Sequence, residues 1–311
     1  MGLNAKKALK VCKKIGYPVI LKASFGGGGK GMRICNNKRE LAEYLPMAVS
    51  ESRSAFGTEE VYIEKYIPKP RHIEFQIIAD NYGNTVCLGE RECSIQRRHQ
   101  KLIEEAPANN LSARTKKHMA NMATKAAESI NYKNVGTIEF LVDQDENFYF
   151  IEINTRIQVE HPVTEMVTGI DLIKEQIKLA AGEKINNDLN NSNPYGKAIE
   201  FRINAEDPDK NFTPSPGKIT DYFIPGGPGV RIDTFIHSNY TVPPFYDSLL
   251  AKLVIWGNDR SEAIARSKRA LEEFRIEGIK TTIPFHKKIL ENKNFVAGNI
   301  HTHFIEEELG V

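Results

Sequence analysis

Apolar and polar side chains recur along the chain with two different periods, and these periods predict its helices and strands. Residues 4–15 and 38–55 carry apolar side chains at helical spacing. A third helix follows Ser112, which is a suitable N-cap. Further helices are predicted at 169–182, at 260–274 and in the C-terminal tail.

Short apolar runs between these helices predict antiparallel hairpins. One hairpin returns at Met32–Cys35 after a glycine loop, and two others turn near 81–84 and 144–147. The remaining strands are predicted at 61–67, 196–207, 217–224, 230–236 and 249–256. Helices mixed with hairpins predict an α+β fold, and the polar linker at 186–194 indicates a domain boundary.

Between Glu152 and Glu165 the chain reads E-I-N-T-R-I-Q-V-E-H-P-V-T-E, with a polar residue at every second position from 152 to 160. If this segment is a strand, these polar side chains share one face. They are costly to bury without partners, so a metal, an anion and a nucleotide are the expected ligands. The five polar residues are Glu152, Asn154, Arg156, Gln158 and Glu160.

A hairpin centred between Asp145 and Glu146 would put Glu139 opposite Glu152. Facing carboxylates repel unless a cation separates them, and magnesium suits the pair with Asn154 on the same face. The alternative is a carboxylate pair in water. Its apolar neighbours are Phe140, Phe148 and Phe150. They disfavour full solvation and therefore favour a metal.

Four consecutive glycines, Gly26–Gly29, lie in the first hairpin close to Lys22 and Lys30. Glycine lets backbone N–H groups approach a phosphate closely, so the loop predicts phosphate binding. Its position between two strands, without G-K-[ST], excludes a P-loop. A flexible hairpin tip without a ligand is the alternative.

Composition and charge refine this picture. Hydrophobic residues make up 41% and charged residues 26%, which is typical of a globular protein, and no apolar run reaches the ~20 residues of a membrane span. No signal peptide is recognisable, and Cys12, Cys35, Cys87 and Cys93 lack metal spacing, which favours free thiols in the cytoplasm.

The net charge of +2 is unevenly distributed. Residues 1–67 hold 12 Lys/Arg and 6 Asp/Glu, or +6, which leaves 30 and 34, or −4, for the rest. A basic first part attracts phosphate, and its glycine loop and few aromatic residues favour a nucleotide over nucleic acid. The simpler alternative is a solvated charged helix face.

Taken together, seven motifs resemble the biotin carboxylase family. They are G-Y-P-V-I-L-K-A-S-x-G-G-G-G-K-G-M, E-K-Y-I, R-H-I-E-F-Q, E-R-E-C-S-I-Q-R-R-H-Q-K, F-I-E-I-N-T-R-I-Q-V-E-H-P-V-T-E, R-I-N-A-E-D-P and P-S-P-G-K-I. The resemblance runs nearly end to end and implies an ATP-grasp fold. It implies a glycine-rich lid at 1–67, a central antiparallel sheet domain at 68–190 and a β-rich C-terminal domain at 191–311.

The resemblance implies that ATP phosphorylates bicarbonate to carboxyphosphate, which carboxylates biotin on a carrier protein. Glu160 would be the base, and Arg202 would stabilise the biotin enolate. Bicarbonate would be held by Lys101, Arg156, Gln158 and Val159. Magnesium (or manganese) would be held by Glu139, Glu152 and Asn154. The nucleotide would be held by Lys22, Gly26, Gly27, Gly28, Gly29, Gly31, Glu64, Lys65, Ile67, His72, Gln96, His99 and Leu141.

The resemblance also implies partners: a biotin carboxyl carrier protein or domain, carboxyltransferase subunits and a second copy of the chain, with no nucleic acid or membrane. Acetyl-CoA carboxylase and fatty acid biosynthesis are one implied setting, and the final carboxyl acceptor stays open. Phe25 replaces a glycine of many family members, which implies a stiffer loop. The family's N-terminal α/β domain has no counterpart before the lid, so we expect weak ATP binding and poor catalysis from these 311 residues.

Two rival functions remain open at this point. Another ATP-grasp ligase, which joins a carboxylate to an amine, would share Lys22, Glu139 and Glu152 but would not need R-I-Q-V-E-H or Arg202. A non-catalytic ATP-binding fragment is the second. Biotin-dependent ADP release that requires bicarbonate separates the enzymes.

Overall fold

The computed structural model describes residues 5–23, 32–186, 188–189 and 194–311. The described chain forms two compact units, one made of residues 1–69 with 98–100 and the other of 70–97 with 101–311. The predicted glycine loop lies outside the described residues. Each unit has its own core, and each is therefore considered by itself.

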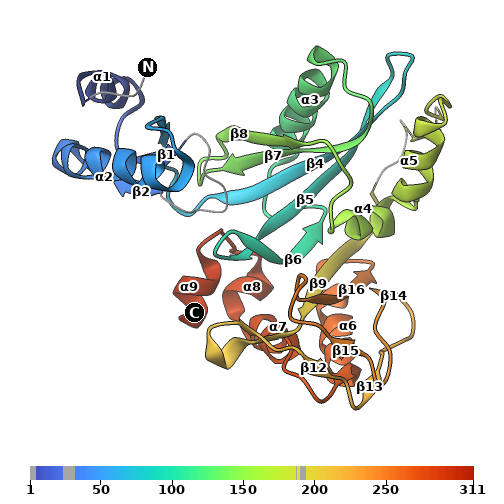
Figure 1. The fold of residues 1–311 in the computed structure, drawn as a ribbon. Coiled ribbons are helices and arrows are strands. Elements are labelled where there is room, and N and C mark those ends of the chain that lie inside the picture. Colours follow the sequence, from blue (N-terminus) through green and yellow to red (C-terminus); the bar gives the residue numbers. More distant parts are fainter. Residues whose placement is uncertain (1–4, 24–31, 187, 190–193) are drawn as a thin grey trace. The chain divides into compact units, whose positions relative to one another are not determined.

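A three-stranded antiparallel sheet with two helices forms the first unit (Figure 1). Its elements are α1 (Ala5–Ile15), β1 (Val19–Ala23), β2 (Arg33–Cys35), α2 (Lys38–Phe56) and β3 (Val61–Lys65), and its strand order is β2-β1-β3. Asn37 caps α2 by accepting from the N–H groups of Arg39 and Glu40. The predicted helices and the first hairpin are confirmed.

An eight-stranded sheet organises the second unit, in the order β14-β16-β9-β6-β5-β4-β7-β8. These strands are β4 (Arg71–Ala79), β5 (Thr85–Arg97), β6 (Gln100–Ala106), β7 (Asn134–Val142), β8 (Phe148–Asn154), β9 (Lys197–Asn204), β14 (Val230–Thr234) and β16 (Leu249–Gly257). Because β9 pairs with β6 and β16, the sheet continues across the polar linker. Residues from both sides of the linker therefore meet on one sheet.

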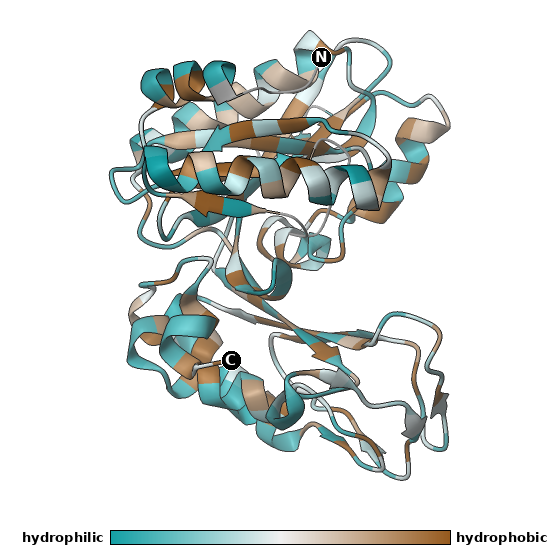
Figure 2. Cartoon of the chain, turned by 60° about the vertical axis from the view of Figure 1, so that its left-hand side comes forward, coloured by the Kyte–Doolittle hydropathy of each residue, from teal (hydrophilic) through white to brown (hydrophobic). Residues whose placement is uncertain are grey.

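Helices pack on this sheet, α3 on β4 and β5, α4 on β5 and β9, and α6 on β9 and β16 (Figure 1). The helices are α3 (Ala113–Ser129), α4 (His161–Thr168), α5 (Leu172–Ala180), α6 (Arg260–Glu273), α7 (Ile283–Glu291), α8 (Lys293–Ala297) and α9 (Phe304–Leu309). Figure 2 shows bands of hydrophilic and hydrophobic residues along the helices. Ser112 caps α3 as predicted.

The remaining strands are short. They are β10 (Glu206–Asp207), β11 (Thr213–Pro214), β12 (Gly217–Lys218), β13 (Tyr222–Phe223), β15 (Thr241–Val242) and β17 (Arg275–Ile276), and a 3₁₀ turn, η2, covers Pro208–Lys210. They form three two-stranded sheets: β10 with β11, β12 with β15, and β13 with β17. The predicted strand at 217–224 is thus divided between two of these pairs.

One expectation about the segment after Glu152 is wrong, and one helix in this segment was not predicted. Strand β8 ends at Asn154, and residues 155–160 form a loop that leads into α4. The polar residues from 156 to 160 therefore do not continue a strand face. Helix α4 was not predicted, although Pro162 in its first turn is a typical start signal.

Glu139 does face Glu152, but through a β-bulge. Phe140 pairs with Phe150 and Glu139 with Glu152, so the register shifts by one residue at Ile151. A regular hairpin with the observed turn would put Ile151 opposite Glu139. The predicted pairing is confirmed, whereas the predicted hairpin centre is wrong.

Arg260 joins α6 to the sheet through a buried carboxylate. Its Nε and Nη2 donate to the two oxygens of Glu105 on β6, each at 2.8 Å. Burial raises the pKa of Glu105, but Arg260 and Lys197 outweigh it and bring the pKa to about 2. A pair of this kind contributes little when intact and is costly when one partner is removed.

We predict that Arg260→Met lowers the free energy of unfolding by about 3 kcal/mol, because Glu105 stays buried after losing its bidentate partner. Chemical denaturation measures this change. Arg269→Met is the matched control, since Arg269 lies exposed on the same helix and pairs with Glu273, and it should change stability by less than about 0.5 kcal/mol. Equal effects of the two substitutions would contradict the prediction.

Candidate active site

A fully buried arginine organises the polar face of the sheet. Arg91 on β5 donates from Nε to Glu74 (2.5 Å) and from Nη1 to Gln76 (2.7 Å), both on β4. It also donates to Thr164 of α4 at 3.0 Å, to Thr137 of β7 at 3.1 Å and to Gln158 at 3.2 Å. The guanidinium thereby ties two strands, a helix and the loop after β8 to its own strand.

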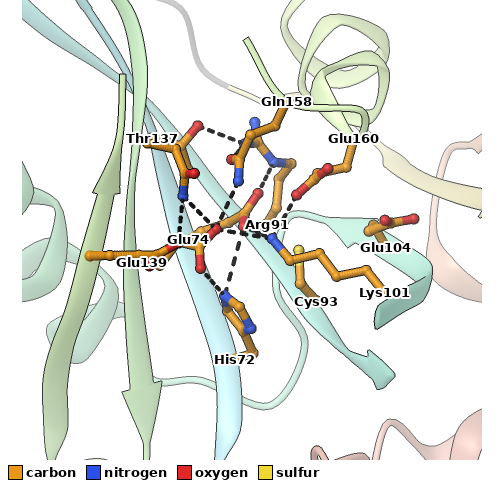
Figure 3. Close-up of polar contacts among 12 residues, drawn as sticks. His72, Glu74, Arg91, Cys93, Lys101, Glu104, Thr137, Glu139, Gln158 and Glu160 are labelled. Carbon is orange, nitrogen blue, oxygen red and sulfur yellow. Dashed lines mark hydrogen bonds and ion pairs between the residues drawn. The ribbon is translucent and has the colours of Figure 1, made fainter. Parts of the chain in front are cut away.

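Lys101 on β6 is shared by three buried carboxylates. Its ammonium lies 2.5 Å from Glu74, 3.1 Å from Glu139 and 2.6 Å from Glu160, and Figure 3 shows it at the centre of these contacts. Burial raises the pKa of Glu74, but Lys101 and Arg91 outweigh it and bring the pKa to about 2. Glu74 is thus buried as an anion beside fixed cations.

Glu160 lies between two cations. Its Oε1 is 2.6 Å from Lys101, and its Oε2 is 2.9 Å from Nη2 of Arg202 on β9. Glu160 is the N-cap residue of α4 and makes no side-chain capping bond, so its carboxylate is directed to the cations instead. A buried carboxylate next to two cations can take a proton from an anion that the cations attract.

Arg202 is held at its side chain and at its backbone. Its Nε donates to Glu104 at 2.6 Å. Its carbonyl oxygen accepts from the hydroxyl of Thr282 and from Nε2 of His286, both at 2.8 Å. Burial lowers the pKa of His286 to about 4, so its ring is neutral and can donate only from the nitrogen that faces the carbonyl.

The predicted metal ligands lie together. Nδ2 of Asn154 donates to Glu139 at 3.0 Å and to Glu152 at 3.2 Å, so the amide bridges the two carboxylates. An amide can present its oxygen by turning over, and two carboxylates with an amide oxygen suit magnesium. These residues fit the metal. Glu152 itself is exposed, as is Phe150, so the expected apolar cover applies to Glu139 alone.

Oε1 of Glu139 joins this group to Lys101 and Gln158. It accepts from Nζ of Lys101 at 3.1 Å and from Nε2 of Gln158 at 2.7 Å. Its Oε2 lies 3.0 Å from Nε2 of His72. Burial raises the pKa of Glu139, but His72, Lys101 and Gln158 outweigh it and bring the pKa to about 2. Glu139 is therefore common to the predicted metal site and the predicted bicarbonate site.

Three predicted nucleotide residues are neighbours in the second unit. His72 pairs with Leu141 across β4 and β7, and its Nδ1 lies 2.7 Å from Nε2 of Gln96. His99 is exposed in the β5–β6 turn with φ at +66°. Within the predicted bicarbonate group, Val159 accepts from Lys252 at 3.1 Å, and Arg156 is exposed.

In the first unit, Lys22 on β1 forms an ion pair with Glu64 on β3. Lys65 donates to the carbonyl of Tyr17 at 2.9 Å, and Ile67 is buried. Gly26, Gly27, Gly28, Gly29 and Gly31 lie outside the described residues, as does Phe25. The phosphate-binding role of that loop stays a prediction.

Sequence reasoning missed Glu74, Arg91 and Glu104, which support the predicted residues. Glu74 alternates with apolar residues on β4, and Arg91 belongs to the quoted motif E-R-E-C, but neither signal distinguishes a buried ion pair from a solvated strand face. Strand β6, which carries Lys101 and Glu104, was also missed. Its two adjacent glutamates resemble an exposed segment.

Comparison with known proteins identifies the family. Residues 1–188 match the model for the carbamoyl-phosphate synthase L chain, ATP binding domain, and residues 200–307 match the biotin carboxylase C-terminal domain. A biotin carboxylase of Nostoc sp. is 55% identical over 97% of this chain and 68% of its own length. The chain belongs to the biotin carboxylase family.

Further relatives agree with this membership. A pyruvate carboxylase subunit of Methanothermobacter thermautotrophicus is 56% identical over 97% of this chain and 61% of its own length. The biotin carboxylase domain dimer of the Hydrogenobacter thermophilus 2-oxoglutarate carboxylase, in complex with MgADP, ADP and bicarbonate, has a TM-score of 0.91. It is 48% identical, over 98% of this chain and 68% of that chain.

Family membership assigns the chain to the ATP-dependent ligases that carboxylate biotin, and the ATP-grasp fold is confirmed. The rival carboxylate–amine ligase is not favoured, because the relatives compared are carboxylases.

Among the described helices of this biotin carboxylase family member, none has the length and apolar character to cross a membrane.

We predict that Lys101→Met lowers the free energy of unfolding at about pH 7 by about 3 kcal/mol or more, because its three carboxylates keep their burial and lose a counter-ion. Without Lys101 their folded pKa values rise. The variant should therefore recover stability between about pH 7 and pH 5, as its carboxylates gain protons. Urea denaturation at both pH values measures the difference.

In acid, the stability of the wild type should change in the opposite direction and fall as the pH falls. The pKa of Glu74 is lowered on folding, so its contribution is present above its unfolded pKa and is lost as the pH falls from about 4 toward 2. Lys288→Met is the control, since Lys288 forms an exposed pair with Asp209 and should leave both measurements unchanged. A deficit in Lys101→Met that is the same at both pH values would exclude the shared counter-ion.

Proposed function

We propose that this chain carboxylates carrier-bound biotin with ATP and bicarbonate, through carboxyphosphate. The observation that carries the proposal is the position of Glu160 between Lys101 and Arg202, in a chain of the biotin carboxylase family. The chain spans 68% of the Nostoc relative and 61% of the Methanothermobacter relative. The activity of those whole proteins is proposed here for the 311 residues.

Bicarbonate is a weak nucleophile, so it must be oriented and must lose its proton before it attacks the γ-phosphate. Lys101, Gln158, Arg156 and the backbone at Val159 would orient the anion. Glu160 would take its proton, because its carboxylate is fixed beside the same ammonium that would bind bicarbonate. The proton would move from the bicarbonate hydroxyl to a Glu160 oxygen. The bicarbonate oxygen would then form a bond to the γ-phosphorus, whose bond to the β–γ bridging oxygen breaks as ADP leaves.

Glu139, Glu152 and Asn154 would hold magnesium or manganese beside the bicarbonate residues. The metal would neutralise charge on the phosphate oxygens. Glu139 would hold the metal on one side, while its contacts with Lys101 and Gln158 align the bicarbonate residues on the other. The shared carboxylate would thereby hold ATP and bicarbonate, the two reactants of the first step, in fixed positions relative to each other.

The nucleotide would be bound by two sets of residues that the family resemblance implies. Lys22 and the glycines at 26–29 and 31 would bind its phosphates. Its base and ribose would meet Glu64, Lys65, Ile67, His72, Gln96, His99 and Leu141. This division accords with a lid at 1–67, a central ATP-grasp domain at 68–190 and a biotin carboxylase C-terminal domain at 191–311. The family models that match at 1–188 and 200–307 support the second boundary.

In the second step the carboxyl group would move from carboxyphosphate to N1′ of biotin, with loss of phosphate. Arg202 would stabilise the biotin enolate, since a guanidinium stays charged at any working pH. The partners would be a biotin carboxyl carrier protein or domain, carboxyltransferase subunits and a second copy of the chain. The cytoplasm is the proposed compartment, in keeping with four free cysteines.

We predict that Glu160→Gln lowers biotin carboxylation by about a hundredfold or more, because the amide cannot accept the bicarbonate proton. ATP affinity should stay nearly unchanged. Biotin- and bicarbonate-dependent ADP release and nucleotide titration measure the two properties. Glu183→Gln is the control, because Glu183 is exposed. Carboxylation retained in Glu160→Gln would remove the assigned base, and ADP release without biotin would favour a different ligase.

We also predict that Glu152→Gln raises the metal concentration needed for half-maximal binding by about tenfold, since one anionic ligand is lost. Binding of Mn²⁺ to the chain with ADP, followed by electron paramagnetic resonance, measures this without turnover. Asp145→Asn in the β7–β8 turn is the matched control, because it removes an exposed carboxylate of the same hairpin. Unchanged Mn²⁺ binding in Glu152→Gln would contradict the metal site.

A further inference from the structure

Two fully buried glutamates face each other next to Arg202. Glu104 on β6 and Glu200 on β9 are direct partners in the antiparallel register, and each is 0% exposed. The Cβ atoms of such partners are about 4.5–5.5 Å apart. Two carboxylates at this separation, away from water, cannot easily both be ionised.

The two carboxyl groups differ in their hydrogen bonds. Glu104 Oε1 accepts from Arg202, which favours the ionised form of Glu104. Its Oε2 and both oxygens of Glu200 accept no hydrogen bond from any group in the described part of the chain. Buried oxygens without donors are costly, and a carboxyl proton on Glu200 would supply the missing donor to Glu104.

Neighbouring charges do not replace that proton. The charged and titratable groups around the pair are Arg202 on β9, Lys101 on β6, Cys93 on β5, Lys252 on β16 and Glu160 at the N-cap of α4. Lys252 acts on Glu200, but its ammonium contacts the carbonyl of Val159 at 3.1 Å and Asp233 at 3.4 Å. Figure 3 shows Glu104 beside the Lys101–Glu160 end of the cluster.

The directions in which burial and neighbouring charges shift the two pKa values agree with this geometry. Burial raises the pKa of Glu200 well above its usual value, the facing Glu104 raises it further, and Lys252 and Arg202 oppose the rise. Burial also raises the pKa of Glu104, to about 7, against the opposing effect of Arg202. The pair therefore keeps a proton at neutral pH.

We propose that Glu200 is protonated at neutral pH and donates a hydrogen bond to Glu104, which holds the Glu104 carboxylate on Arg202. Glu200 is then a positioning residue, and it acts on Arg202 through Glu104. Since Arg202 also contacts Glu160, the buried proton sets the distance between the two groups of the proposed reaction. This role rests on the proposed function, but the proton itself can be measured without any turnover.

Infrared difference spectroscopy of the 311-residue chain at neutral pH tests the proton directly. The spectrum of the wild type minus Glu200→Gln should contain the carbonyl stretch of one protonated carboxyl group, which ionised carboxylates lack. Glu183→Gln, which changes an exposed glutamate, should not remove that band. Absence of the band from the wild type, or its persistence in Glu200→Gln, would overturn the proposal.

The pH dependence of stability is a second measure. The pKa of Glu200 is raised on folding, so its contribution is present below the unfolded pKa of about 4.3 and is lost as the pH rises toward the folded value. Between about pH 5 and pH 9 the wild-type Tm should fall more than that of Glu200→Gln, by about 2–4 °C. Parallel Tm profiles would overturn the proposal.

The positioning role has its own test, since Glu200→Gln keeps a hydrogen-bond donor and Glu200→Ala does not. Glu200→Ala should lower kcat for biotin carboxylation by about tenfold, and Glu200→Gln should restore most of it. Equal loss in both variants would refute positioning. If the wild type shows the infrared band but carboxylates no biotin, the proposed function fails while the buried proton stands.

Discussion

The site depends on the buried guanidinium of Arg91. A fully buried cation is tolerated only when acceptors surround it, because an unpaired one costs several kcal/mol. The acceptors of Arg91 come from four separate segments: Glu74 and Gln76 on β4, Thr137 on β7, Gln158 in the loop and Thr164 on α4. Satisfying one residue therefore fixes the loop that carries Gln158 and Glu160 against the sheet.

From that anchor, charges of opposite sign alternate across the sheet. Glu74 lies between Arg91 and Lys101, Lys101 lies beside Glu160, and Glu160 contacts Arg202. The cations lie on the three adjacent strands β5, β6 and β9, so the field around Glu160 exists before any anion binds. Preorganised charge of this kind needs no rearrangement at the moment of reaction, which is where electrostatic catalysis gains most.

The sequence predicts what depends on local periodicity. The helices at 38–55 and 260–274 and the hairpin turns follow from it, and motif resemblance adds the residues of the site. It could not reveal the bulge at Ile151, because a shift of register is decided by packing and not by spacing. Nor could it reveal that Arg91 is buried, since its partners lie 15 to 73 residues away. Buried polar networks are the part of a fold that local patterns miss.

The last constraint comes from the far side of the linker. Glu160 belongs to the segment matched by the ATP-binding family model and Arg202 to that of the C-terminal model, yet they are 2.9 Å apart. Pairing of β6 with β9 places Arg202 on the strand next to that of Lys101, which also contacts Glu160, and Thr282 and His286 fix the Arg202 backbone from the C-terminal region. The C-terminal region thus supplies both the cation and its support. A chain cut at the linker would keep Glu160, the proposed base, and lose Arg202, which faces it.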